Sequence, residues 1–196
     1  MAKNNKKKKQ SKLAVFAKKV SGIFLIMFVV AVYLSLLTYN PADPSLNQQN
    51  NLEPTNILGL FGSNLADFIL CSFGIAIAVF MLGFVRWGIG LIRHNTIVEF
   101  KVRLFAFLMG VFSLSSLIHL MYPKIWGNYH LGGKVAQISV GLIQTQLSKY
   151  NIPYGVEIMT AVFALISFMS FNMVLGITLK CWYAVIKFIF NKFFSY

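Results

Sequence analysis

The sequence predicts an all-α membrane protein with four transmembrane helices and both termini in the cytoplasm. Three observations support this class. Hydrophobic residues make up 57% of the 196-residue chain and charged residues 12%, against about 25% charged residues in a typical soluble domain. Four apolar segments without Asp, Glu, Lys or Arg are long enough to cross a bilayer as helices. The cations, which give a net charge of +13, lie mostly beside one end of these segments.

The four apolar segments place helices at residues 21–38, 67–86, 104–122 and 157–179, in one domain of residues 21–179. A basic arm of residues 1–20 precedes this domain, and a basic tail of residues 180–196 follows it. The apolar runs are continuous rather than alternating, which favours helices over strands. The arm and the first segment also resemble a cleavable signal peptide, but no small-residue cleavage pattern follows, so an uncleaved anchor is favoured.

The distribution of Lys and Arg predicts the orientation of the helices. Fifteen of the 18 cations lie in the arm, in the connection after the second helix or in the tail. Lys124, Lys134 and Lys149 lie in the remaining connections, at residues 39–64 and 123–155. Because positively charged loops stay in the cytoplasm, these two connections are predicted to be external.

The first external loop begins with a turn. Pro41 and Pro44 disfavour helix, and Asp43 and Ser45 have short side chains that accept hydrogen bonds from nearby backbone amides. The loop is therefore predicted to fold back on itself rather than to extend the first helix.

Short polar residues and glycines precede the second apolar segment. Gly59 and Gly62 permit a bend or a close approach of two backbones. Asn64 and Asp67 are placed to cap the free amides of the second helix. We interpret Asp67 as a structural cap rather than as a proton carrier.

The third segment contains three serines that can bond inside a membrane. Ser113, Ser115 and Ser116 can each donate to a neighbouring helix or to a carbonyl of their own helix. The sequence does not choose between these two possibilities.

The second external loop contains an amphipathic stretch at residues 133–149. Polar residues recur there at steps of three and four, as on one face of a helix. We predict an interfacial helix between the third and fourth transmembrane helices. A helix packed over the mouth of the bundle is the alternative.

No pattern in the chain predicts a catalytic, cofactor or metal site. His94, His119 and His130 fall in three separate regions, and none has a paired acid in the sequence. The Lys-rich arm has the charge of a nucleic-acid-binding segment, but it adjoins a membrane helix, so a topology signal with attraction to anionic lipids is favoured.

Two stretches resemble the N-terminal membrane domain of the FtsK/SpoIIIE DNA translocases of bacteria. They are LLTYNPADPS at the end of the first segment and NILGLFGSNLADFILCSFGIAIA at the start of the second. A Gly-Gly pair before the fourth segment also matches. The residues that carry the resemblance are Tyr39, Asn40, Pro41, Asp43, Pro44, Ser45, Asn56, Gly59, Gly62, Leu65, Ala66, Asp67, Phe73, Gly74, Gly132 and Gly133. The chain departs from the family pattern at Ser63, at Asn64 and in YNIPYG of the second loop.

This resemblance implies a membrane anchor at the division septum of a bacterial inner membrane, acting in cell division and chromosome segregation. It implies membrane lipids, other division proteins and further copies of the chain, as a hexamer, as partners. DNA would be reached only through a motor domain that this sequence lacks, so no enzyme activity is expected of the chain. The alternative function is a small transporter or channel subunit, which would favour ionisable groups or broken helices near the middle of the membrane.

Overall fold

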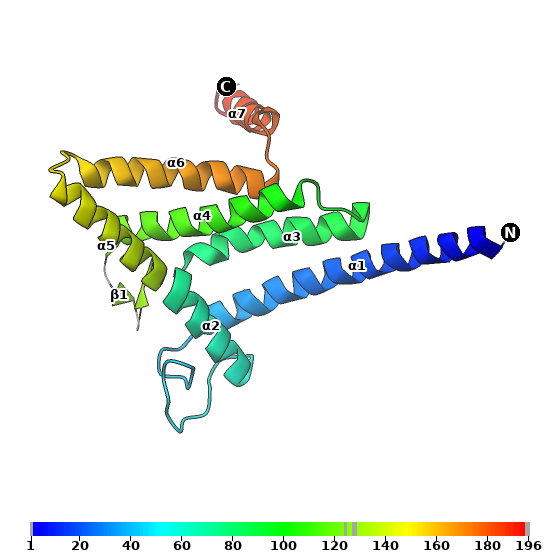
Figure 1. Cartoon of the computed structure of the whole chain (residues 1–196), viewed down its shortest axis with the longest axis horizontal. Coiled ribbons are helices and arrows are strands. Elements are labelled where there is room, and N and C mark those ends of the chain that lie inside the picture. Colours follow the sequence, from blue (N-terminus) through cyan, green and yellow to red (C-terminus); the bar gives the residue numbers. More distant parts are fainter. Residues whose placement is uncertain (1, 124, 127–128, 195–196) are drawn as a thin grey trace.

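Helix α1 (Ala2–Leu37) runs without a break from the basic arm into the first apolar segment. The computed structural model describes residues 2–123, 125–126 and 129–194. Within these residues the chain forms seven helices and two short strands, shown in Figure 1. After α1 come α2 (Gly59–Phe73), α3 (Ala76–His94), α4 (Phe100–Met121), β1 (Ile125–Trp126), β2 (Tyr129–His130), α5 (Gly133–Lys149), α6 (Gly155–Leu175) and α7 (Leu179–Phe194).

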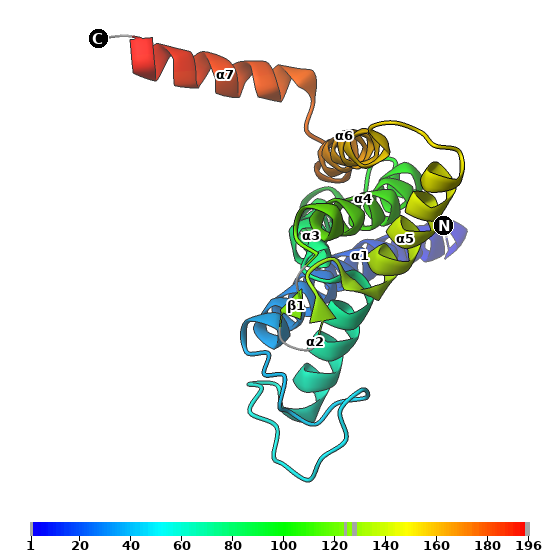
Figure 2. The same ribbon diagram turned by 90° about the vertical axis from the view of Figure 1, so that its left-hand side faces the viewer.

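Four helices are long and apolar enough to span a membrane, namely α3, α4, α6 and residues Lys12–Leu37 of α1. They lie side by side in one row, with α1 against α3, α3 against α4, and α4 against α6 (Figures 1 and 2). The predicted class, a helical membrane protein with four transmembrane helices, is confirmed. The antiparallel pair of two-residue strands, β1 and β2, is an addition that the sequence did not predict.

An aromatic cluster joins three of the spans. Phe80 of α3 lies edge-on to Phe107 of α4 and to Phe171 of α6, with ring centroids 6.3 and 5.9 Å apart. Such pairs add about 0.5–1.5 kcal/mol each to the burial of the rings. Nearby, Trp87 Nε1 donates to the carbonyl of Val174 at 3.0 Å, which pairs two groups where lipid offers no hydrogen-bond partner.

Helices α1 and α3 touch at a pair of glycines. A Cβ on Gly22 would lie 2.7 Å from the carbonyl oxygen of Gly88, and a Cβ on Gly88 would lie 2.8 Å from that of Gly22. Small residues allow this approach. Further along the same pair of helices, Tyr33 donates its hydroxyl to the carbonyl of Ala78 at 2.7 Å. The two helices are therefore held together at two levels.

The prediction of one continuous second helix over residues 67–86 is wrong. The chain ends α2 at Phe73 and starts the second span at Ala76. Gly74 between them has φ 61°, a conformation that glycine adopts easily, and Ile75 donates its amide to the carbonyl of Leu131 at 3.0 Å. Helix α2 therefore lies across the axes of the spans, as Figures 1 and 2 show.

Other boundaries differ less from those predicted. Helix α4 starts at Phe100 rather than at residue 104. Helix α6 ends at Leu175 rather than at residue 179, because Gly176 takes the left-handed conformation that commonly ends a helix. The basic arm is helical as part of α1, and the basic tail contains α7. Lys124, Gly127 and Asn128 of the predicted second external loop lie outside the described residues.

Helix α5 forms over the residues at which an amphipathic helix was predicted. It packs against α2 and α4, and Ala136 and Val140 are buried on that side. Ile138 and Leu142, in contrast, are exposed. The helix thus covers one end of the bundle, as in the alternative arrangement, and keeps an apolar face outward.

The two ends of the spanning helices differ in composition. The loop of residues 38–58, α2 and α5 lie at one end, here named the outer layer (Figure 1). The start of α1 and the connection between α3 and α4 lie at the other end. This second end, here named the basic end, carries Arg93, Lys101 and Arg103.

Candidate functional site

The loop of the outer layer is folded around the carboxylate of Asp43. This side chain is 5% exposed. Its Oδ1 accepts hydrogen bonds from the amide and the hydroxyl of Thr55, at 2.9 and 2.8 Å. Its Oδ2 accepts from the amide of Asn56 at 2.9 Å and from the hydroxyl of Ser63 at 3.2 Å. These four residues, Asp43, Thr55, Asn56 and Ser63, are named the polar lock below.

The hydrogen bonds of the polar lock keep Asp43 ionised. Burial acts to raise the pKa of this carboxyl group, but the bonds from Thr55, Asn56 and Ser63 outweigh it, and the pKa lies below its ordinary value. The carboxylate is therefore a charged acceptor at neutral pH. An acid whose oxygens are engaged in this way serves to hold the loop together rather than to transfer protons.

Asn56 connects the polar lock to the end of α1. Its Nδ2 donates to the carbonyls of Ser35 and Thr38, at 2.9 and 3.2 Å. These carbonyls lie in the last turn of α1 and directly after it, where the helix itself supplies no donor. The other side-chain atom, Oδ1, accepts the amide of Leu58 at 3.1 Å. A Cβ on Gly62 would overlap this oxygen, so α2 approaches Asn56 only because residue 62 is glycine.

Asp67 does not cap a helix, and that prediction is wrong. It lies inside α2, is 2% exposed, and accepts a hydrogen bond from Asn47 Nδ2 at 2.7 Å. The first residues of α2 and α3 have no side-chain cap, and Asn64 donates back to the carbonyl of Leu60 instead. Asp67 therefore ties the tip of the loop to the middle of α2.

Tyr39 adjoins this second acid. Burial raises the pKa of its phenol to about 12, and the charges of Asp67 and Cys71 contribute in the same direction. The phenol is therefore neutral over the physiological range. Tyr39, the first of the residues that carry the family resemblance, thus lies in the same polar region as Asp67.

The remaining residues of the first motif shape the turn. Asn40 Oδ1 accepts the amide of Ala42, and its Nδ2 donates to Thr55 Oγ1, both at 3.0 Å. Ser45 Oγ accepts the amide of Gln48 at 3.2 Å, which confirms the predicted bonding of Ser45 to a nearby amide. Pro41 is exposed and Pro44 is half-buried at the same turn.

The glycines of the later motifs meet at the break between α2 and α3. Gly74 and Gly133 both have positive φ, 61° and 74°. A Cβ on Gly74 would overlap the carbonyl oxygen of Leu131, and a Cβ on Gly133 would lie 2.5 Å from the carbonyl oxygen of Ser72. Side chains at these positions would displace the backbone.

Helix α4 completes this junction. A Cβ on Gly132 would lie 2.5 Å from the carbonyl oxygen of Ser115, and Ser115 Oγ donates to the carbonyl of Phe73 at 2.8 Å. Ser113, by contrast, donates to Met109 of its own helix at 2.7 Å. Both possibilities raised for the serines of this helix therefore occur. Gly74, Gly132 and Gly133 are named the glycine junction below.

Three motif residues have simpler surroundings. Gly59 has φ 59° but open space where a Cβ would lie, so only its backbone conformation requires glycine. Ala66 is fully buried, and Leu65 packs against the main hydrophobic core.

The structure thus brings the two stretches of the resemblance together around Asp43 and Asn56, and it brings Phe73 and Gly74 to the Gly-Gly pair. Asn47 and Thr55 were missed by sequence reasoning, because amides and hydroxyls in a polar loop give no distinguishing signal. Ser63, which departs from the family pattern, is a member of the polar lock.

Two of the histidines are adjacent in space. The rings of His119 and His130 lie with centroids 5.5 Å apart, and His130 Nδ1 lies 3.0 Å from the carbonyl oxygen of Pro123. Among the described residues, no group of three or more His, Cys, Asp or Glu side chains is placed to hold a metal ion.

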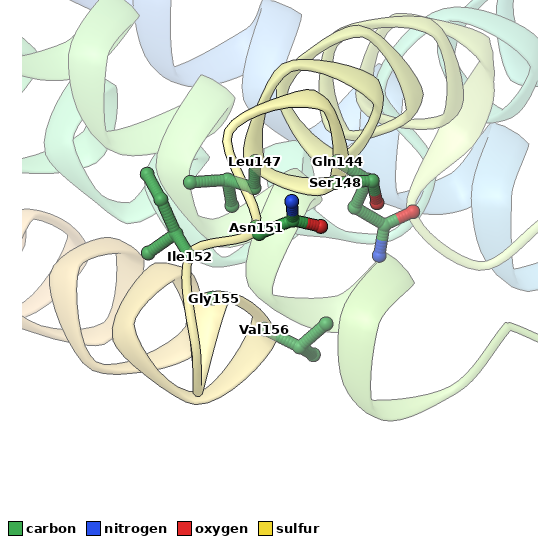
Figure 3. A pocket seen from close by; sticks show the side chains of 7 residues that line it. All are labelled: Gln144, Leu147, Ser148, Asn151, Ile152, Gly155 and Val156. Carbon is green, nitrogen blue, oxygen red and sulfur yellow. The ribbon is translucent and has the colours of Figure 1, made fainter.

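A cavity of about 490 Å³ lies between α5 and the start of α6 (Figure 3). Amide and hydroxyl side chains and apolar groups line it: Gln144, Leu147, Ser148, Asn151, Ile152, Gly155 and Val156. None of these lining residues has an ionisable side chain.

The fold and its outer layer together define a four-span helical membrane domain whose loop of residues 38–58 is fixed by a buried acid. A family model described as the 4TM region of DNA translocase FtsK/SpoIIIE matches residues 15–179. The chain belongs to this family. It is a multi-pass inner-membrane protein and carries the membrane-anchor region of an FtsK-type DNA translocase.

Three relatives illustrate the extent of the similarity. The DNA translocase FtsK of Agrobacterium fabrum is 30% identical over 108 residues, which is 55% of this chain and 12% of the relative. That of Rhizobium meliloti is 32% identical over 108 residues, again 55% and 12%. That of Rickettsia typhi is 30% identical over 100 residues, 51% of this chain and 13% of the relative. The chain thus matches only a small part of each relative's length, and no solved structure matches it.

Proposed function

We propose that this chain anchors a DNA translocase in the inner membrane at the division septum. Its role there is to hold copies of the motor together during cell division and chromosome segregation. The observation that carries the proposal is the match of residues 15–179 to the membrane region of the FtsK/SpoIIIE translocases. The match covers the membrane region of such proteins and not their motor part.

The outer layer supports a role in contacting other proteins. The polar lock holds a loop whose apolar side chains Leu46, Leu52 and Ile57 are 72%, 62% and 65% exposed. A rigid loop with exposed apolar side chains loses little conformational entropy on binding. We assign this surface to contact with other division proteins.

The charge distribution supports an orientation with both termini in the cytoplasm. The basic end carries the cations of the connection between α3 and α4, and the start of α1 carries those of the arm. Positive charge beside short connections retains them in the cytoplasm. The outer layer then faces away from the cytoplasm, where it can meet division proteins.

Septal recruitment is tested by imaging the full chain, fused at its N-terminus to a fluorescent protein, in dividing bacteria. We expect fluorescence enriched at midcell. The double variant Leu46→Ser/Leu52→Ser, which leaves the polar lock intact, is expected to lose this enrichment but to remain in the membrane. Gly141→Ala, on an open position of α5, is the matched control. Uniform envelope fluorescence of the unaltered chain would argue against septal placement.

Anchoring is tested separately by replacing the membrane region of a relative with this chain. We expect the chimera to support chromosome segregation, and the same motor without any membrane region to fail. A chimera that is inserted in the membrane at normal level but does not segregate chromosomes would contradict the proposal.

A further inference from the structure

Helix α7 has two chemically different faces. Lys180, Lys187 and Asn191 are spaced by seven and four residues, so they lie along one side of the helix. Trp182 and Ile186 lie toward the opposite side, and Ile186 is 62% exposed. Tyr183 is an exception, since it lies three residues after Lys180 and four before Lys187 and therefore shares their side. The pattern is that of a helix with one face in water and the other in an apolar phase.

The position of α7 relative to the spans is fixed at its first turn. The chain leaves α6 through Gly176, which has φ 66°. Trp182 of α7 then donates its indole N–H to the side-chain oxygen of Asn172 in α6, and its ring lies 5.7 Å from that of Phe168. These contacts set the angle between the two helices.

This angle places α7 across the axes of the spans. Figure 2 shows the spans nearly end-on and α7 from the side, whereas Figure 1 shows the spans from the side and α7 nearly end-on. Helix α7 begins only a few residues beyond the end of span α6, at Leu179. A helix that starts where a span leaves the hydrocarbon and runs across it lies in the plane of the lipid headgroups.

The surrounding charges indicate which lipids α7 meets. The turn before α7 lies against Arg103, because a Cβ on Gly176 would be 2.6 Å from Arg103 Nη2. This places α7 on the side of the basic end, where its own Lys180 and Lys187 add positive charge. Lysines at a membrane surface attract anionic headgroups.

We infer that α7 is a membrane-surface helix that binds anionic phospholipids on the leaflet at the basic end. Ile186 enters the boundary between headgroups and acyl chains, and Lys180 and Lys187 contact lipid phosphates. The inference goes beyond the proposed function and does not depend on septal placement. It assigns a lipid class to a segment that adjoins the anchor.

The first experiment measures which face of α7 meets lipid. The full chain, with Cys71→Ser and Cys181→Ser, receives a single nitroxide at Ile186→Cys or at the adjacent Lys187→Cys. Each sample is reconstituted in nanodiscs that contain phosphatidylglycerol, with one chain per disc. We expect the label at 186 to be several-fold more accessible to oxygen than to a water-soluble nickel chelate, and the label at 187 to show the opposite ratio. Equal ratios at the two positions would overturn the inference.

The second experiment tests the requirement for anionic lipid. In nanodiscs of phosphatidylcholine alone, and with Lys180→Glu/Lys187→Glu in phosphatidylglycerol, the label at 186 is expected to become markedly more accessible to the nickel chelate. Lys180→Arg/Lys187→Arg preserves the charge and is expected to behave as the unaltered helix. Lys149→Glu, in α5 of the outer layer, is the control for net charge. Retention of the original ratio at 186 in phosphatidylcholine would overturn the role of anionic lipid.

A second copy of the chain is the alternative partner for the apolar face. Discs loaded with two chains labelled at 186 report this by dipolar broadening of their spectra. Broadening, together with a label shielded from both oxygen and nickel, would show a protein contact and overturn the inference. Unbroadened spectra with high oxygen accessibility support the lipid assignment.

Discussion

Gly62 of α2 lies directly against the carboxamide of Asn56, so that a Cβ on the glycine would overlap Asn56 Oδ1. Asn56 is 4% exposed and holds the carbonyls of Ser35 and Thr38 at the end of α1. The absence of a side chain at residue 62 is therefore what allows one amide to connect α1 with α2.

This contact predicts that Gly62→Ala and Asn56→Ala are not additive. Either change alone is expected to cost about 2 kcal/mol of unfolding free energy, because both release buried carbonyls from their donor. The double variant is expected to cost clearly less than the sum, because the carboxamide that the new Cβ would meet is then gone. The unaltered chain, the two single variants and the double variant form a double-mutant cycle, and the unfolding free energy of each is measured with denaturing detergent in mixed micelles. Additive losses would contradict the proposed contact.

The lowered pKa of Asp43 predicts that the folded chain loses stability in acid. Its pKa in the folded chain lies below the ordinary value of 3.8, so its contribution is complete above that value and is lost as the pH falls through the folded pKa. Asp43→Ala is expected to cost about 3 kcal/mol at neutral pH, since it leaves buried donors unpaired, and to remove this part of the acid dependence. Unfolding measured from pH 7 to pH 2.5 tests both points.

Glu53→Gln is the control for this measurement, because Glu53 is an exposed acid of the same loop. It is expected to leave stability at neutral pH nearly unchanged. If Asp43→Ala and Glu53→Gln behaved alike, the polar lock would not hold the loop.

The glycine junction predicts that the loss of stability on replacing a glycine by alanine depends strongly on which glycine is replaced. Gly74→Ala and Gly133→Ala are each expected to cost about 2 kcal/mol or more, because both residues have positive φ and a neighbouring backbone atom occupies the place of the Cβ. Gly141→Ala in α5 meets open space and is expected to stabilise the chain by about 0.5–1 kcal/mol. Thermal unfolding in one detergent compares the three variants. Similar effects at all three positions would refute the junction.

Asn47 lies in the outer layer and Arg93 at the basic end, which are opposite ends of the spanning helices. The two positions are therefore predicted to be labelled from opposite sides of the membrane. In a chain with Cys71→Ser and Cys181→Ser, Asn47→Cys is expected to react with a membrane-impermeant thiol reagent added to spheroplasts. Arg93→Cys is expected to react only after the membrane is opened. Labelling of both cysteines from the same side would contradict the four-span arrangement.

Hydropathy predicted the spans because lipid imposes the same requirement on every residue of a crossing helix. It did not predict the break at Gly74, because apolar residues continue on both sides and the cause is the remote carbonyl of Leu131. The turn at Ser45 was predictable from local chemistry, since its partner is Gln48. The partners of Asp43 were not, because Thr55 and Ser63 become its neighbours only when the loop closes and α2 packs against the end of α1.

The contact between Gly22 and Gly88 has a mechanical consequence. Helix α1 is one uninterrupted rod from the basic arm to the residues that Asn56 holds. Sliding this rod along α3 by a turn would drive the side chain of Ile26, which already lies beside Gly88, into the facing backbone. A pull on the arm along the membrane normal therefore cannot be absorbed by slippage inside the bilayer, and the tension reaches the loop on the far side.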